Sequence, residues 1–200
     1  MKKITFSLLL IFSTISYSQS WDYFGNAGFS NGISNNLSLG IDLPSGDVWL
    51  ALQDMGDDGK LSIYSNDYTS NWVNNISGLS SGYANNIDFD IDVNGNPYYS
   101  YIDGNGDYVG FGYFNNTQGW QERNPLNGGS NIGGHSINSI TKENADGKVF
   151  ICSYHNSWNI VIYRSNNIGN GFTIDHSFGQ LGDGNISQIS FDIKYNTVTS

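Results

Sequence analysis

The chain has 200 residues, a formal net charge of −10 and a single cysteine. An acidic chain without a cluster of Lys or Arg repels nucleic acids and anionic membrane surfaces, which excludes DNA and RNA as partners. The lone Cys152 cannot form an intrachain disulfide, and the apolar run "KVFICSY" around it indicates a buried thiol. The fold must therefore be held by its core and its hydrogen bonds.

The N-terminal segment "MKKITFSLLLIFSTISYSQS" has the pattern of a secretory signal peptide. A basic start at Lys2 and Lys3 precedes an apolar run, and small residues then frame a cleavage site directly after Ser18. The apolar run is too short for a membrane span. We therefore expect residues 1–18 to be removed on export and residues 19–200 to be secreted or held at the cell surface, without membrane insertion.

Tryptophan segments recur along the mature chain at intervals of about fifty residues, a period typical of arrays and propellers. They begin at Trp21, Trp72 and Trp120, and Phe172 takes the tryptophan position at the start of a fourth period. The predicted repeat units are therefore residues 21–71, 72–119 and 120–171 and a partial unit, 172–200.

Each period predicts the same order of strands. Gly, Asn and Ser supply turns, while Tyr, Phe and Trp favour strands. After a Gly/Ser/Asn loop come three strands, and the next tryptophan segment is the fourth; four short antiparallel strands per period describe a propeller blade. The predicted fold class is thus all-β, a β-propeller of about three and a half blades in an incomplete ring. The three inner strands of each period are expected at 35–42, 47–54 and 60–67, at 85–92, 97–104 and 108–116, and at 135–141, 148–155 and 159–167.

Two segments resemble the blade repeats of secreted bacterial β-propeller proteins, which read roughly W-x-x-x-G, G-F-S and G-x-P-Y-x-x-x-x-D. They are "WDYFGNAGFS" in the first period and "NGNPYYSYID" in the second. The third period departs most, because His155 stands where the other two periods have aspartate. The resemblance implies a propeller fold and export. The second segment matches the pattern at Gly95, Pro97, Tyr98 and Asp103.

The number of blades favours a longer protein. About three and a half blades are too few to close a ring, since closed propellers have four to eight. The chain is therefore interpreted as the N-terminal part of a longer protein, which would supply further blades or a downstream domain.

The stretch GFSNG, residues 28–32, has the G-x-S-x-G spacing of a hydrolase nucleophile elbow, with Ser30 as its serine. Such an elbow lies between a strand and a helix, but no helix is predicted here, and the spacing recurs as GLSSG at residues 78–82. We interpret both stretches as tight turns between blades. The three histidines occupy different places in the repeat, so no catalytic residue is predicted.

One face of the predicted propeller collects the loops from outer to inner strands and the loops between second and third strands. Carboxylates lie beside aromatic rings there, a combination that binds sugars in concave, partly apolar sites. The alternative is that these residues only form polar turns. The predicted ligand-binding residues are Phe29, Asp54, Asp57, Tyr83, Asp103, Asp107, His155 and Trp158.

A calcium ion is the only cofactor that the sequence suggests. Asp103, Asn105 and Asp107 occupy positions 1, 3 and 5 of a calcium loop. Tyr108 and Phe114 replace its glycine and its glutamate, so the segment is not an EF-hand. A loosely bound structural Ca²⁺ therefore stays open, and no other cofactor is expected.

The preferred functional hypothesis is a non-catalytic recognition module that binds an extracellular glycan or protein through this loop face. One alternative is part of a polysaccharide-degrading hydrolase or lyase whose catalytic residues lie mostly outside the chain, and another is a spacer for a downstream domain. Asp54 and Asp103 recur at equivalent positions, which favours binding or scaffolding, because catalysis needs an asymmetric set of residues.

Overall fold

The structure is a computed structural model, and it contains twelve strands and one short 3₁₀ helix within its described residues. The predicted signal peptide and most of the fourth period lie outside those residues. In the described part of the chain, no helix is long and apolar enough to cross a membrane. The described residues are 25–67, 71–92, 94–104, 108–123, 138–142, 149–155, 159–165 and 172–178.

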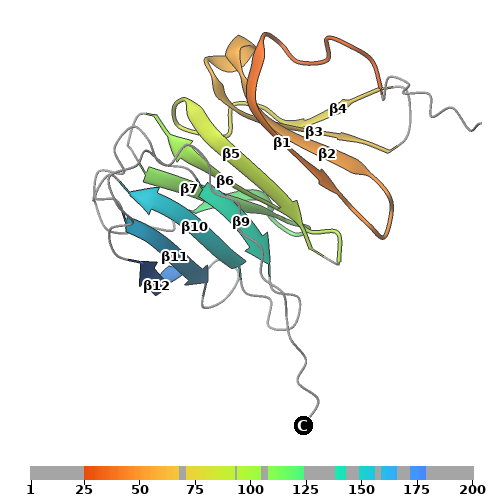
Figure 1. Cartoon of the computed structure of the whole chain (residues 1–200). Coiled ribbons are helices and arrows are strands. Elements are labelled where there is room, and N and C mark those ends of the chain that lie inside the picture. The colour runs from red at the N-terminus through yellow and green to blue at the C-terminus, as the bar shows by residue number, and fades with distance from the viewer. Residues whose placement is uncertain are drawn as a thin grey trace, which may run out of the picture.

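Three antiparallel sheets of four strands follow one another along the chain (Figure 1). Neighbouring strands in each sheet are consecutive in sequence, so each sheet is a simple meander. The three predicted strands of each of the first three periods are confirmed, and the segments at Trp72, Trp120 and Phe172 supply the fourth strands. Trp21 lies outside the described residues. The first sheet contains β1 (Ser34–Ile41), β2 (Val48–Asp54), β3 (Lys60–Asn66) and β4 (Val73–Ile76). The second contains β5 (Ala84–Ile91), β6 (Pro97–Asp103), β7 (Tyr108–Asn115) and β8 (Gly119–Arg123), and the third contains β9 (Asn138–Lys142), β10 (Val149–His155), β11 (Asn159–Ser165) and β12 (Phe172–Phe178).

The sheets are arranged as blades of a β-propeller. The first strand of each sheet lies next to the first strand of the following sheet, so β5 lies between β1 and β9 (Figure 1). The outer strands β4, β8 and β12 form the opposite edges of the three sheets. The predicted all-β class with four-stranded antiparallel propeller blades is confirmed.

The inner strands of the first two blades have the same irregularity. The pairing of β1 with β2 shifts register between Asn35 and Ser38, and that of β5 with β6 shifts between Asn85 and Asp88. Asn36 and Asn86 lie inside these shifts with φ angles of 44° and 47°, a left-handed conformation that Asn adopts more readily than most residues. Residues fifty positions apart are therefore structurally equivalent here, so Ile33 corresponds to Tyr83 and Leu39 to Phe89.

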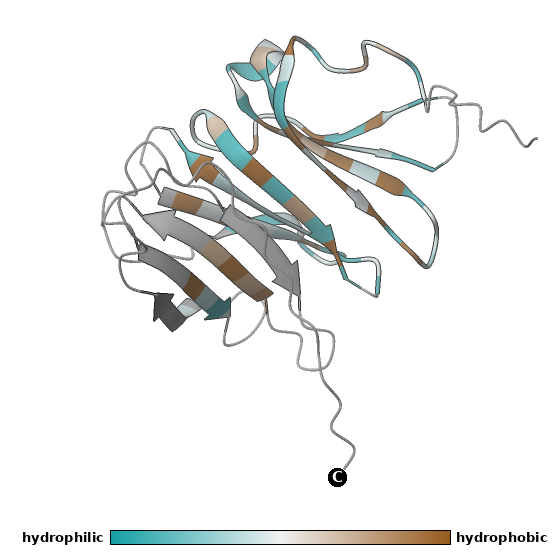
Figure 2. Ribbon diagram, in the orientation of Figure 1, coloured by the Kyte–Doolittle hydropathy of each residue, from teal (hydrophilic) through white to brown (hydrophobic). Residues whose placement is uncertain are grey.

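A continuous apolar interface joins the first two blades. Trp49, Ala51 and Ile63 of the first blade pack against Ile87 and Phe89 of the second, and the Trp49 and Phe89 rings lie 6.5 Å apart between centroids. Hydrophobic and polar residues alternate along β5 (Figure 2). The alternation directs Ile87 and Phe89 toward the first blade, because successive side chains of a strand point to opposite sides.

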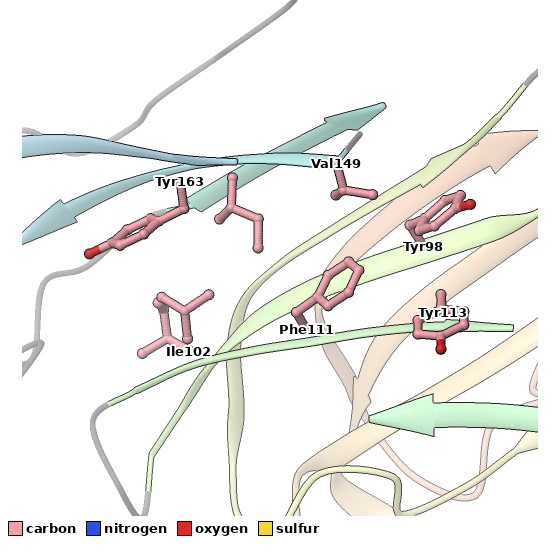
Figure 3. Close-up of a cluster of buried hydrophobic side chains, with 8 residues drawn as sticks. Tyr98, Ile102, Phe111, Tyr113, Val149 and Tyr163 are labelled. Carbon is pink, nitrogen blue, oxygen red and sulfur yellow. The ribbon is translucent and has the colours of Figure 1, made fainter. Parts of the chain in front are cut away.

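The second and third blades share an interface of the same kind. Figure 3 shows Val149 and Tyr163 of the third blade directed toward Tyr98, Ile102 and Phe111 of the second. All five side chains are buried. Each described junction between blades is thus a layer of aromatic and aliphatic side chains, which compensates for the absence of disulfides.

Two glycines of β7 make room for tyrosines of the neighbouring strand. Tyr99 pairs across the sheet with Gly112, and Tyr101 pairs with Gly110. A Cβ atom at Gly112 would lie 2.1 Å from the Tyr99 ring, and one at Gly110 would lie 2.3 Å from the Tyr101 ring. The rings therefore occupy the space that side chains would fill on β7.

The hydroxyl groups of these two tyrosines have different surroundings. The Tyr101 hydroxyl donates a hydrogen bond to Glu122 Oε1. The Tyr99 hydroxyl is buried and has no hydrogen-bond partner, and burial raises the pKa of Tyr99 well above its usual value. An unpaired buried hydroxyl costs free energy, because it has lost its hydrogen bonds to water.

We expect Tyr99→Phe to raise the free energy of unfolding by about 1 kcal/mol, because it removes a buried hydroxyl without a partner. Tyr101→Phe, on the same side of the same strand, should lower it by about 1 kcal/mol, since it removes a hydrogen bond to a carboxylate. Urea denaturation of both variants measures the two effects. Equal effects in the two variants would contradict the conclusion that the Tyr101 hydroxyl is hydrogen-bonded and the Tyr99 hydroxyl is not.

Cys152 is a buried residue of β10, as predicted. Its side chain is 3% exposed, and burial raises the pKa of the thiol to about 11. A thiol in this setting is almost entirely protonated at neutral pH, and the protonated form is a poor nucleophile. Cys152 is therefore a packing residue of the third blade.

Candidate functional site

The two G-x-S-x-G stretches form the same turn at the start of the first and second blades. Ser30 Oγ donates to the carbonyl oxygen of Gly32 at 2.8 Å, and Ser80 Oγ donates to that of Gly82 at 2.6 Å. Both hydroxyls are used within the turn, and each stretch leads into a strand. This geometry agrees with the turn interpretation of residues 28–32 and 78–82, which we call the interblade clips.

The carboxylate of Asp54 fixes the first interblade clip by hydrogen bonding. It accepts hydrogen bonds from the Asn31 amide at 3.2 Å, the Gly56 amide at 2.9 Å and the Tyr64 hydroxyl at 3.1 Å. Burial, together with this carboxylate, raises the pKa of Tyr64 to about 12. Asp54 is completely buried, and it also caps the 3₁₀ helix Met55–Asp57.

Asp103 has the same role in the second blade. Its Oδ2 atom accepts hydrogen bonds from Ser81 Oγ at 2.6 Å and from the Gly82 amide at 3.3 Å. Like Asp54, Asp103 is completely buried at the end of the second strand of its blade. Both aspartates were predicted on the ligand-facing surface, but the structure buries them beneath the clips, where they accept hydrogen bonds from backbone amides and side-chain hydroxyls.

The second clip also bonds to the preceding blade. Ser80 Oγ accepts a hydrogen bond from the Leu61 amide at 3.0 Å, and the Leu79 amide donates to the Leu61 carbonyl oxygen at 2.9 Å. The Ala84 amide donates to the carbonyl oxygen of Gly59 at 3.0 Å. The clip therefore fixes the first and second blades to each other at the loop face.

Tyr83 directly follows the second clip, and its ring remains half exposed, at 49%. The ring lies on Gly59, where an added Cβ atom would be 2.3 Å from Tyr83 Cδ1. The Tyr83 carbonyl oxygen accepts a hydrogen bond from the Gly104 amide at 2.8 Å. The peptide group between Tyr83 and Ala84 is thus fixed by Gly104 of the second blade and by Gly59 of the first. The exposed Asp58 directly precedes Gly59.

A chain of amide side chains continues from Tyr83 toward the inner strands. Asn85 and Tyr83 both lie close to Gly104, because a Cβ atom added there would be 3.0 Å from Tyr83 Cβ and 3.5 Å from Asn85 Nδ2. Asn85 Oδ1 accepts a hydrogen bond from Gln53 Nε2 at 3.3 Å, and Gln53 Oε1 accepts one from Asn36 Nδ2 at 3.1 Å. An exposed ring beside fixed amide groups offers one apolar surface together with hydrogen-bond donors and acceptors.

The other predicted ligand-binding residues are distributed differently. Phe29 stacks on Trp72 and meets Tyr64 edge-to-face, with 5.0 Å between ring centroids in both pairs, so it belongs to the apolar packing of the first blade. Asp57 is half-buried, and it accepts hydrogen bonds from Asn31 Nδ2 and Ser62 Oγ. The backbone of His155 ends β10 opposite Asn159. Asp107 and Trp158 lie outside the described residues.

The predicted calcium set is only partly described. The carboxylate of Asp103 is engaged by the clip, and Asn105 and Asp107 lie outside the described residues. In the described part of the chain, no group of three His, Cys, Asp or Glu side chains is positioned to hold a metal ion. Calcium binding remains a prediction from the sequence.

Two exposed residues of this face, Ile33 and Met55, were not among the predicted ligand-binding residues. Ile33 is 76% exposed, and its carbonyl oxygen accepts a hydrogen bond from the Met55 amide at 3.0 Å, as that of Tyr83 does from Gly104. Met55 is itself exposed. The repeat contained the signal, because Ile33 stands fifty positions before Tyr83 and directly follows a G-x-S-x-G stretch.

Comparison with known proteins gave similarity in fold alone. No protein family and no curated protein matches the chain. A fucose lectin from Kordia zhangzhouensis, solved with methyl-fucoside, is 14% identical with a TM-score of 0.46, over 69% of this chain and 96% of the lectin. An exo-β-1,3-galactanase from Phanerochaete chrysosporium, solved with β-1,3-galactotriose, is 12% identical with a TM-score of 0.44, over 74% of this chain and 37% of the enzyme.

A third structure, a bifunctional GH43-CE protein of Bacteroides eggerthii, is 18% identical with a TM-score of 0.43, over 70% of this chain and 19% of that protein. The chain thus corresponds to nearly all of the lectin but to a minor part of the two larger proteins. Similarity at this level does not extend to function.

Proposed function

We propose that the protein is a secreted or cell-surface recognition module without catalytic activity, and that it binds extracellular glycans through the loop face around Tyr83. The observation that carries the proposal is the half-exposed Tyr83 ring, whose backbone is fixed between two blades. A fixed ring can stack on the apolar face of a sugar at a small cost in conformational entropy.

The neighbouring polar groups support a carbohydrate rather than an apolar ligand. Gln53 hydrogen-bonds to both Asn85 and Asn36, and the exposed Asp58 directly precedes Gly59, on which the ring lies. Amide and carboxylate groups orient sugar hydroxyls by hydrogen bonding. Asp54 and Asp103 act indirectly in this proposal, because they hold the clips that position the ligand-binding side chains.

Electrostatics and the N-terminus agree with an extracellular setting. A net charge of −10 disfavours nucleic acids and anionic lipid surfaces, whereas neutral glycans are not repelled. The signal peptide predicted at residues 1–18 would deliver the module outside the cell. An extracellular protein is the second candidate ligand for the same face.

We expect Tyr83→Ala to weaken glycan binding by roughly tenfold or more, because the variant loses the stacking surface. Affinity electrophoresis in gels containing soluble polysaccharides measures the retardation of the protein, and Tyr83→Phe should keep it. Leu43→Ala is a suitable control, because Leu43 is 83% exposed in the turn between β1 and β2, away from the clips.

Unchanged retardation of Tyr83→Ala on a polysaccharide that retards the parent protein would disprove the role of Tyr83. If no polysaccharide retards the parent, an extracellular protein becomes the preferred ligand class. Repeating the gels with a chelator tests the predicted calcium, because a structural ion would support the loop face only while it is bound.

A further inference from the structure

The inner strand of the first blade exposes a row of large apolar side chains. Leu37, Leu39 and Ile41 alternate along β1, and their exposed fractions are 63%, 53% and 49%. Ile33 and Leu43, at the two ends of β1, extend the row. We call Leu37, Leu39 and Ile41 the β1 ridge. Contiguous exposed apolar surface of this kind marks an interaction site more often than chance exposure does.

In the second blade, the equivalent row of side chains packs against a neighbouring blade. The equivalent residues of β5 are Ile87, Phe89 and Ile91; Ile87 is 9% exposed and Phe89 is 5% exposed. Ile87 and Phe89 are buried because the first blade packs on them, and Ile91 is partly buried against the same cluster. The β1 ridge therefore repeats the side of an established interface between blades, but nothing in the described part of the chain covers it to the same degree.

The charge pattern favours a second copy of the chain as the covering surface. Strand β1, SNNLSLGI, has no charged residue, whereas β5, ANNIDFDI, contains Asp88 and Asp90. In a protein of net charge −10, two copies repel each other over most of their surface. An uncharged edge strand is a place where two copies can approach without opposing carboxylates.

The ridge is also compatible with two-fold symmetry. An interface of this symmetry brings the same surface of both subunits together. An axis through Leu39 places Leu37 of one copy against Ile41 of the second, and Leu39 against its own counterpart. The same axis separates the two Asp42 carboxylates, because Asp42 follows only the C-terminal end of β1.

We propose that the β1 ridge is a homodimer interface, formed by antiparallel packing of β1 against β1 of a second copy. The two loop faces then belong to one particle, so that a repeated glycan could be bound at two points, with a gain in avidity. The dimer does not depend on glycan recognition and can be tested separately.

Sedimentation velocity over a concentration series tests the proposal on the mature protein. We expect a monomer–dimer equilibrium, and we expect Leu39→Asp to weaken the dimer at least tenfold, because it would place two carboxylates against each other on the axis. Val73→Asp is the matched control, since Val73 is 56% exposed on the outer strand β4. It should leave the equilibrium unchanged.

Cross-linking gives a second measurement that does not rely on a destabilising charge. Oxidation of Leu39→Cys should produce a covalent dimer on a non-reducing gel, because the two cysteines meet on the axis. Oxidation of Val73→Cys should not, because β4 lies outside the proposed interface. The native Cys152 is buried and should not contribute a disulfide to either variant. A protein that stays monomeric at all concentrations and is not cross-linked would overturn the proposal. A monomer whose thermal stability falls in Leu39→Asp would also overturn it, because the ridge would then be covered by the same chain.

Discussion

Gly112→Ala is expected to lower the free energy of unfolding by about 3 kcal/mol, because the added methyl group would overlap a buried ring. The added Cβ atom would lie 2.1 Å from Tyr99, whose ring is fully buried between the first and second blades. The ring has no free space nearby, because Tyr101 stacks beside it and Trp120 lies 5.9 Å away between centroids. Chemical denaturation followed by tryptophan fluorescence measures the change.

A double variant separates this clash from a general effect of replacing glycine in a strand. Tyr99→Leu alone should be destabilising, because it removes buried surface. Combined with Gly112→Ala, however, it should cost clearly less than the sum of the two single changes, since the smaller side chain leaves room for the new methyl group. Strict additivity, or a loss below about 0.5 kcal/mol for Gly112→Ala alone, would refute the packing explanation.

Asp54→Ala should lower the free energy of unfolding by about 3 kcal/mol, because three donors lose their common acceptor inside the protein. These donors are the amides of Asn31 and Gly56 and the hydroxyl of Tyr64. Buried donors without partners are costly, since water cannot replace the lost acceptor. Thermal and urea unfolding both report the loss.

Asp58→Ala is the control for this prediction, because Asp58 lies in the same turn and is exposed. Its replacement should change stability by less than about 0.5 kcal/mol. If the two variants have similar stability, Asp54 does not hold the clip, and its assignment as a ligand-binding residue would regain support.

The fold was predictable from the sequence because its signals are local. The alternation IDFDI in β5 indicates a strand with one apolar side, and recurrence of such strands between glycine-rich turns indicates blades. The packing of the Tyr99 ring into the space beside Gly112 was not predictable, because it depends on which residues face each other across β6 and β7. In the first blade, the corresponding pair is Leu50 and Tyr64, so the large ring lies on the other strand.

The candidate site was predictable only in part, because the polarity of a residue does not determine whether its side chain is buried or exposed. Tyr83 was expected at the surface and is exposed there. Asp54 and Asp103 were predicted beside it because the loops between second and third strands were expected to emerge on the same face as the loop that carries Tyr83. Here the preceding clip folds back over each carboxylate, a contact between segments about twenty residues apart that no local pattern encodes.

The residues of the loop face fall into two groups: those whose side chains make hydrogen bonds that the fold needs, and those whose side chains do not. The serine and glycine positions of the clips, with the aspartate beneath, are committed to hydrogen bonds that join strands and blades. The position after each clip has only its backbone committed, and it already differs between Ile33 and Tyr83. A substitution at this position can therefore change the side chain presented at the loop face without removing these hydrogen bonds, so under the proposed function the ligand preference could change while the blades are kept.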